Sequence, residues 1–300
     1  MKINRFPLRS LMFVPGHNIK LIESASKSQA DALIFDLEDS VQPPSNKEKA
    51  REIIVESSME PRFDRFQKFV RLNEVNSEFF FKDVLEVTKG DIDGFLLSKA
   101  NTPKEVQYLD SLLSSIEREL RLESESFSII PILESAKSIV NINEIAQSSS
   151  RIVALGFGSE DFVSDIDGIR DFDTNNSISF PRRLVPIVAK ANNLEAIDAA
   201  YIKVHDLAGL RKHLEMGKIL GYFGMWVLHP KQNCLVNEIF SPTEQEYEEA
   251  KDFLRLYEDA KKLDKGVAII EGKFVGPPLI TKSNEIIKRF ESIRLREQES

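Results

Sequence analysis

Acidic side chains follow two consecutive apolar segments in the middle of the chain. Glu134 comes directly after residues 129–133, and Asp161 follows residues 152–157. A carboxylate buried beside apolar side chains needs a hydrogen bond, a basic partner or a metal ion, because desolvating it alone costs several kcal/mol. Two carboxylates, completed by water and substrate oxygens, are a usual protein site for Mg²⁺. The pattern therefore indicates magnesium held by Glu134 and Asp161, with a pair of helix N-caps as the structural alternative.

A second charged group lies earlier in the chain. Arg71 follows two apolar residues, and Asp36 and Glu38 lie at the end of the apolar residues 32–37. A guanidinium matches a carboxylate through two parallel hydrogen bonds, so Arg71 is a candidate for binding a substrate carboxylate, for an internal ion pair with Asp36 or Glu38, or for both. Asp36 and Glu38 are expected to point the same way, since alternate residues of a strand share a face. We predict Arg71, Glu38 and Asp36 as catalytic residues, with one of the acids orienting Arg71 or metal-bound water.

Histidine and cysteine give weaker signals. His229 follows residues 223–228 and His17 follows residues 10–14, and we interpret both as structural hydrogen-bonding residues. Cys234 is the only cysteine and lies among aliphatic residues, so it is predicted to belong to the core. A single cysteine excludes an intrachain disulfide and is compatible with a reducing compartment.

Eight short apolar segments position these side chains. Most are apolar throughout rather than alternating, which is typical of parallel strands buried on both faces. They are residues 10–14, 32–37, 68–72, 94–98, 128–133, 152–157, 196–203 and 223–228.

The segments between these strands have helix start signals. Capping boxes are predicted at Ser45, Thr102 and Thr243. Eight buried strands alternating with helices predict an α/β fold, a (β/α)8 TIM barrel, over residues 1–240. An open doubly wound sheet is the alternative, but no Gly-x-Gly-x-x-Gly follows the first strand, which disfavours a nicotinamide-dependent dehydrogenase. In such barrels the chemistry lies at the carboxyl ends of the strands, where these charged residues fall.

The last sixty residues exceed what a barrel needs. Residues 243–263 and 283–297 predict amphipathic helices on either side of an apolar segment. We expect residues 241–300 to form a C-terminal helical extension that packs on a neighbouring subunit of a homo-oligomer.

Composition limits the partners. The chain has 300 residues, 42% of them hydrophobic and 29% charged, as in soluble globular proteins. A net charge of -8 without a basic stripe disfavours nucleic acid. No apolar stretch is long enough for a signal peptide or a membrane span, so no membrane partner is expected and a cytoplasmic location is predicted.

Several motifs resemble the citrate lyase beta-subunit family, within the citrate lyase/dihydroxyheptenedioate aldolase superfamily. They occur in the family's order at residues 9–16, 30–41, 70–73, 131–135, 154–161 and 221–232. The resemblance implies a (β/α)8 barrel in homo-oligomers, often trimers or hexamers. By motif position, Glu134 and Asp161 correspond to the magnesium ligands. Arg71 corresponds to the arginine that binds the substrate's carboxylate or oxo group.

The resemblance also implies an activity. Members of this family make or break carbon–carbon bonds next to a thioester carbonyl, with citryl, citramalyl or malyl thioesters as typical substrates. We therefore predict a magnesium-dependent carbon–carbon lyase or aldolase for small 2-oxo or 3-hydroxy acids, with CoA thioesters as the expected form.

One departure from the family pattern favours a second hypothesis. Family members that act on thioesters carry an aspartate near the C-terminus that reaches a neighbouring subunit's site. The matching stretch here is residues 271–278, and Gly276 stands at the aspartate's position, with Glu271 as the nearest carboxylate. The alternative is a binding subunit for an oxo acid or an acyl carrier, with lost or altered activity.

Overall fold

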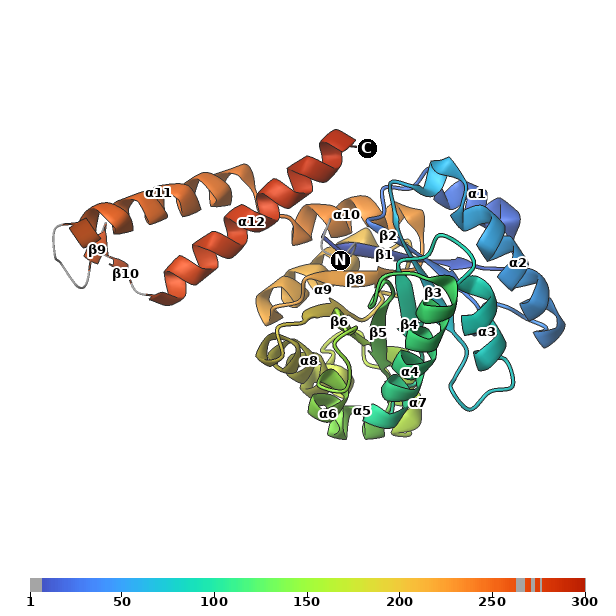
Figure 1. The fold of residues 1–300 in the computed structure, drawn as a ribbon. Coiled ribbons are helices and arrows are strands. Elements are labelled where there is room, and N and C mark those ends of the chain that lie inside the picture. The colour runs from blue at the N-terminus through green and yellow to red at the C-terminus, as the bar shows by residue number, and fades with distance from the viewer. Residues whose placement is uncertain (1–6, 263–267, 271–272, 276, 300) are drawn as a thin grey trace. The chain divides into compact units, whose positions relative to one another are not determined.

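Eight parallel strands close into a barrel in chain order (Figure 1). The computed structural model describes residues 7–262, 268–270, 273–275 and 277–299. The predicted TIM barrel is confirmed. Its strands are β1 (Ser10–Pro15), β2 (Ala32–Asp36), β3 (Gln67–Leu72), β4 (Gly94–Leu97), β5 (Ser128–Leu133), β6 (Ala154–Phe157), β7 (Glu195–Asp198) and β8 (Gly224–Val227).

Pairing of β1 with β8 closes the barrel, with Ser10 opposite Met225. The interior is filled by a cluster of large apolar side chains, and the alternate strand residues pack outward against the helices. Burial on both faces explains why the strand segments are apolar throughout. The interior cluster includes Leu11, Ile34, Phe69, Leu96, Ile130, Ile132, Ile197 and Trp226.

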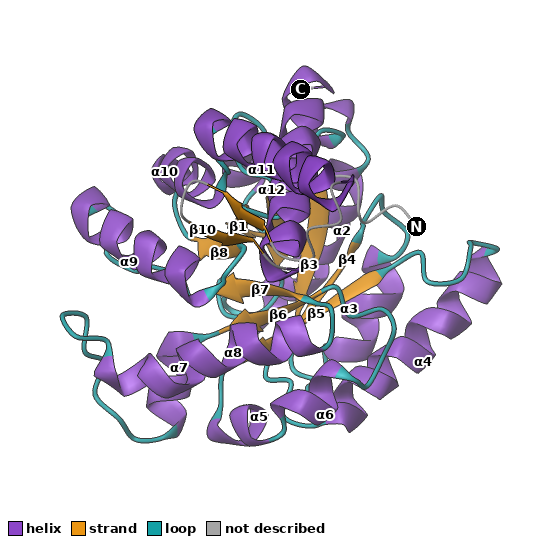
Figure 2. Ribbon diagram, turned by 90° about the vertical axis from the view of Figure 1, so that its left-hand side faces the viewer, coloured by secondary structure: helices purple, strands orange, loops and turns teal. Residues whose placement is uncertain are grey.

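Helices surround the strands as an outer layer (Figure 2). The barrel unit contains α1 (Ile19–Ala25), α2 (Lys47–Ser58), α3 (Phe80–Val87), α4 (Pro103–Leu120), α5 (Ala136–Val140), α6 (Ile142–Ala146), α7 (Ser159–Asp165), α8 (Ser179–Ala191), α9 (Leu207–Leu220) and α10 (Pro230–Phe240). Single 3-10 turns lie at Pro44–Asn46, Pro61–Phe63 and Asn176–Ile178. No helix in the described part of the chain is long and apolar enough to cross a membrane.

Two of the three predicted capping boxes are present. Glu105 accepts the backbone N–H of Thr102 at 2.5 Å, and Glu246 accepts that of Thr243 at 2.7 Å. The capping box at Ser45 is wrong, because Ser45 lies inside the 3-10 turn Pro44–Asn46, which leads directly into α2.

The seventh strand is shorter than the predicted residues 196–203. It ends at Asp198, whose carboxylate turns outward to Arg182 of α8 at 2.5 Å. The same carboxylate also accepts the N–H of Ala199 at 2.9 Å. The N–H of Ala199 thus has a side-chain partner at the position where the strand ends.

A second compact unit contains residues 241–300. It comprises α11 (Glu244–Lys262), the antiparallel pair β9 (Ala268–Ile270) and β10 (Lys273–Val275), and α12 (Pro277–Glu299). The two helices pack together through stacked rings of Tyr247 and Phe290, whose centroids are 4.3 Å apart. Gly276 and Glu271, on which the predicted departure from the family depends, lie outside the described residues.

The barrel interior leaves no room for a side chain at Gly156. A Cβ on Gly156 would lie 2.0 Å from Cζ2 of Trp226, whose indole N–H donates to the carbonyl of Phe157 at 3.0 Å. We expect Gly156→Ala to lower the free energy of unfolding by about 1–3 kcal/mol, the usual cost of overpacking a core. Urea denaturation of this variant checks the prediction, with Ser111→Ala on the exposed side of α4 as the control. Equal stability of wild type and Gly156→Ala would contradict it.

Candidate active site

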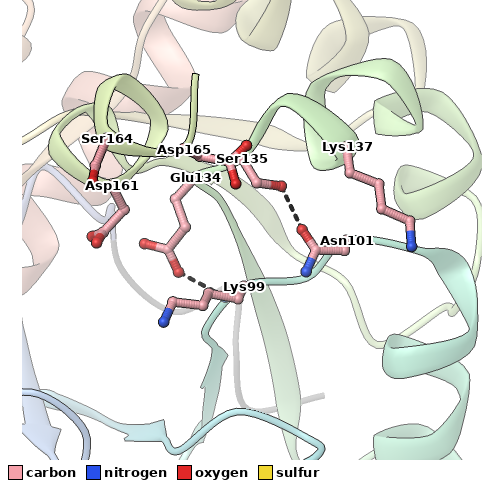
Figure 3. A pocket seen from close by; sticks show the side chains of 8 residues that line it. All are labelled: Lys99, Asn101, Glu134, Ser135, Lys137, Asp161, Ser164 and Asp165. Carbon is pink, nitrogen blue, oxygen red and sulfur yellow. Dashed lines mark hydrogen bonds between the residues drawn. The ribbon is translucent and has the colours of Figure 1, made fainter. Parts of the chain in front are cut away.

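Charged side chains from five neighbouring strands meet at the carboxyl end of the barrel. Asp36 and Arg71 are paired residues of β2 and β3, Lys99 follows β4, Glu134 follows β5 and Asp161 follows β6. Lys99, Glu134 and Asp161 line one cavity of about 340 Å³. Figure 3 shows the carboxylates of Glu134 and Asp161 turned toward the same side of this cavity, called here the Glu134 cavity.

Glu134 is the most deeply buried acid of this cavity. Its side chain is 5% exposed, and its carboxylate accepts the backbone N–H of Lys99 at 2.7 Å (Figure 3). Lys99 directs this N–H from a left-handed backbone conformation with φ of 48°, which lysine rarely adopts. Its ammonium pairs with Glu74 instead. Within the described residues no basic side chain forms an ion pair with Glu134, so its charge is not neutralised.

The pKa of Glu134 reflects this environment. Burial is the largest cause and raises the pKa to about 8, and repulsion by Glu38 and Asp161 adds to the effect. The hydrogen bond from Lys99 and the charge of Arg71 oppose the shift without cancelling it. At neutral pH the metal-free site therefore holds a proton on this carboxyl group, and a bound cation would displace it.

Asp161 is exposed and lies in the first turn of α7. Gly158 is the N-cap of that helix, and Ser135 is the N-cap of α5. The alternative in which Glu134 and Asp161 are helix N-caps is therefore wrong.

Gly158 also gives Glu134 its space. A Cβ at this position would lie 2.8 Å from Oε2 of Glu134 and 2.6 Å from its Cβ. Gly156 and Gly158 thus have separate packing roles, one toward Trp226 and one toward Glu134.

Arg71 forms the second charged group with three acids. Its Nε and one terminal nitrogen each donate to Asp36 at 2.7 Å, and the other terminal nitrogen lies 2.8 Å from Glu38 and 3.4 Å from Asp39. The predicted internal ion pair is therefore present, and Asp36 and Glu38 reach the same guanidinium. The guanidinium carbon also lies 4.9 Å from the centre of the Phe13 ring.

The two acids differ in their titration. Burial would raise the pKa of Asp36, but the hydrogen bonds and charge of Arg71 outweigh it and hold the pKa below its usual value. Burial raises the pKa of Glu38 to about 7, against the opposing charge of Arg71. Asp36 is therefore a fixed anion, whereas Glu38 can accept or release a proton near neutral pH.

Three weaker predictions have mixed outcomes. Nδ1 of His229 accepts the backbone N–H of Lys231 at 3.2 Å, a structural hydrogen bond as expected. Nδ1 of His17 is buried and makes no hydrogen bond with any described residue, so its predicted structural bond is not seen there. Cys234 is exposed, because the buried face of α10 is taken by Gln232, Asn233, Val236 and Phe240.

Sequence reasoning missed the contribution of Lys99. A lysine at the end of β4 was visible, but a left-handed conformation at lysine has no signature in the sequence, and the group used is its backbone N–H. The contact of Phe13 with Arg71 was also missed, because an aromatic residue within an apolar strand is predicted to belong to the hydrophobic core.

A TIM barrel with a buried, unpaired acid at the carboxyl end of its strands is typical of enzymes, but many unrelated enzymes share this fold. Comparison with known proteins identifies the family. The chain belongs to the HpcH/HpaI aldolase/citrate lyase family, whose sequence model matches residues 9–230. The resemblance inferred from the motifs is therefore confirmed.

Similar proteins cover nearly the whole chain. The citrate lyase subunit beta of Leuconostoc mesenteroides subsp. cremoris is 28% identical over 93% of this chain and 92% of its own length. An L-malyl-CoA/beta-methylmalyl-CoA lyase of Cereibacter sphaeroides is 30% identical over 96% of both chains. The CitE protein of Mycobacterium tuberculosis, solved with magnesium, acetoacetate and coenzyme A, has a TM-score of 0.77 at 21% identity and covers 96% of this chain and 99% of that one. The predicted class of carbon–carbon lyase agrees with these names.

The raised pKa of Glu134 makes stability depend on pH. The pKa lies above the ordinary 4.5 in the folded protein, so the folded state binds more protons between pH 4.5 and about 8. The stabilisation of the folded state by this extra proton is fully present below pH 4.5 and is lost as pH rises through about 8. Glu134→Gln keeps an oxygen for the Lys99 N–H and removes the titration. At pH 8.5 we expect the metal-free variant to exceed wild type by on the order of 2 kcal/mol, with a smaller difference at pH 5.

Urea denaturation at both pH values measures this difference. Glu38 repels Glu134, so the measured difference includes the coupling between these two acids. Glu119→Gln, on the exposed side of α4, is the matched control and should follow wild type. If the free energy of unfolding of wild type and of Glu134→Gln changed with pH in the same way, burial would not raise the pKa of Glu134.

Proposed function

We propose that this chain is a magnesium-dependent carbon–carbon lyase acting on CoA thioesters of small 3-hydroxy acids, of citramalyl, malyl or citryl type, to give a 2-oxo acid and a shorter acyl thioester. The observation that carries the proposal is the buried Glu134 carboxylate, which has no basic partner among the described residues and shares a cavity with Asp161. Membership of an aldolase/citrate lyase family supports the reaction class.

The residues present fit magnesium. Glu134 and Asp161 offer hard oxygen ligands, and Mg²⁺ commonly takes one or two carboxylates and completes its shell with water and substrate. The described residues contain no group of three or more His, Cys, Asp or Glu that could hold a metal, so in this proposal water and substrate would supply the rest of the shell around the two carboxylates. The M. tuberculosis protein of the same fold binds magnesium. When bound, the ion would stabilise negative charge on the substrate's hydroxyl or oxo oxygen.

The protein's own groups have separate roles in this proposal. The N–H of Lys99 and the absence of a side chain at Gly158 hold Glu134 in place. Arg71 is oriented by Asp36 through Nε and one terminal nitrogen, and its other terminal nitrogen, which lies beside Glu38, is the group that would bind the substrate's carboxylate.

Glu38 is the proposed proton carrier, since its pKa is about 7 and it lies beside Arg71. It takes the proton of the substrate's hydroxyl group. The bond between the hydroxyl-bearing carbon and the thioester's α-carbon then breaks, its electron pair passes to the α-carbon, and Glu38 returns the proton there.

A binding subunit for an oxo acid or an acyl carrier is the second candidate. It is favoured by Gly276, which stands where related lyases carry an aspartate. Both candidates use the same metal and the same Arg71, and they differ in turnover.

We also propose that the C-terminal unit packs on a neighbouring subunit of a trimer or hexamer, which light scattering of the purified protein tests.

Removal of either metal-binding carboxylate tests the proposed function. The protein is incubated with Mg²⁺ and citramalyl-, malyl- and citryl-CoA, and release of the acyl thioester is followed. Glu134→Gln and Asp161→Asn should each lower kcat/KM by about 100-fold or more, because charge stabilisation in the transition state is lost. Both should also weaken Mg²⁺ binding measured by calorimetry.

Glu160→Gln is the matched control for these variants. Its carboxylate belongs to the same turn but pairs with Arg170 at 2.9 Å, so activity and Mg²⁺ affinity should stay near those of wild type. Full activity of Glu134→Gln contradicts the proposed site. Tight binding of pyruvate or oxaloacetate without turnover of any thioester favours the binding subunit.

A further inference from the structure

A second cavity of about 370 Å³ opens on the other side of the barrel mouth. Phe13 and Pro15 of β1 and Leu228 after β8 form its apolar walls. The Glu134 cavity draws on the ends of β4, β5 and β6, whereas this one draws on β8, β1, β2 and β3. We call it the Phe13 cavity.

Arg71 connects the two cavities. It lines the Phe13 cavity and lies over the Phe13 ring, and its charge also acts on Glu134. A substrate whose oxygens are held at Glu134 and whose carboxylate reaches Arg71 has two further groups on its hydroxyl-bearing carbon, the thioester arm and one small substituent. A CoA thioester arm is too long for a cavity of about 370 Å³, so the small substituent is the group that fits the Phe13 cavity.

The charges around the Phe13 cavity do not favour a second carboxylate. Asp36 and Asp39 line it, and Glu38 is held close to the same guanidinium. Arg71 is paired with all three acids and has to serve the substrate's first carboxylate as well.

The nearby ammonium group of Lys47 is also engaged. It is buried and bound to the carbonyls of Leu37 and Glu38 and to the side chain of Asn73, at 2.6 to 3.0 Å. Ser40 adds only a hydroxyl group to the cavity lining. An anionic substituent would thus meet carboxylates without a free cation in the described part of the site, whereas a neutral apolar one would bury against Phe13, Pro15 and Leu228.

We infer that the Phe13 cavity binds the apolar substituent on the carbon that carries the substrate's hydroxyl group. This inference rests on the proposed function and narrows its substrate class. The chain should prefer methyl- or ethyl-substituted thioesters, of the citramalyl kind, over the unsubstituted malyl kind. Citryl thioesters, which carry a carboxymethyl group at the same carbon, should be the poorest substrates.

The test compares kcat/KM for four CoA thioesters that differ only in this substituent: hydrogen, methyl, ethyl and carboxymethyl. The methyl compound should exceed the hydrogen compound by about 10-fold, as expected for an added methyl group in a hydrophobic pocket. The ethyl compound should equal or exceed the methyl compound, and the carboxymethyl compound should be at least 10-fold below it.

A charge placed in the cavity should invert the preference. Leu228 is 42% exposed, so Leu228→Arg can be introduced without disturbing the core, and it should raise the carboxymethyl-to-methyl ratio by about 10-fold or more. Leu122→Arg is the matched control, because Leu122 is 44% exposed and precedes β5, at the opposite end of the barrel, and it should leave the ratio unchanged.

Calorimetry with Mg²⁺ and the free oxo acids makes the test independent of turnover. Pyruvate and 2-oxobutanoate should bind more tightly than oxaloacetate. If no thioester is cleaved but this order holds, the lyase proposal fails and the inference about the cavity stands. The inference is overturned, while the lyase proposal stands, if kcat/KM for citryl-CoA equals that for citramalyl-CoA. It is also overturned if Leu228→Arg leaves the carboxymethyl-to-methyl ratio of kcat/KM unchanged.

Discussion

The candidate site depends on one carboxylate that the protein buries and does not neutralise. Glu134 follows a strand that is apolar on both faces, and the fold gives it one backbone hydrogen bond, from Lys99, and no ion-pair partner within the described residues. Such a group is destabilising by itself, since burial penalises its charged form. Carboxyl groups with strongly shifted pKa values cluster at functional sites. We propose that a cation binding between Glu134 and its neighbour Asp161 relieves this cost.

The barrel makes this arrangement possible because it sets strand ends side by side. Lys99, Glu134 and Asp161 are far apart in sequence but follow three consecutive strands. The ends of β2 and β3 show the opposite charge arrangement, because the basic side chain of Arg71 forms ion pairs with Asp36, Glu38 and Asp39. The mouth thus has one side whose buried acid has no ion-pair partner among the described residues and one side whose positive charge is already balanced. This asymmetry supports a metal on the first side and a neutral substituent on the second.

Much of the fold could be predicted from the sequence, because its signals are strong and local. Continuous apolar segments predict buried parallel strands, and the charged residues at or after several of them, such as Asp36, Arg71 and Glu134, mark the carboxyl end. Features set by tertiary contacts could not be predicted. The left-handed turn at Lys99, the closeness of Gly158 to Glu134 and the early end of β7 at Asp198 depend on partners from distant segments. Ser45 failed as a cap for a local reason, since a 3-10 turn already includes it.

The most direct test of the central claim is anomalous diffraction from crystals grown with Mn²⁺, which replaces Mg²⁺ and scatters anomalously, together with pyruvate. The account predicts one strong peak within coordination distance of the carboxylates of both Glu134 and Asp161, with pyruvate oxygens completing the shell on the side of Arg71. A peak bound to only one of these carboxylates, or a mouth without any peak at saturating Mn²⁺, would contradict it.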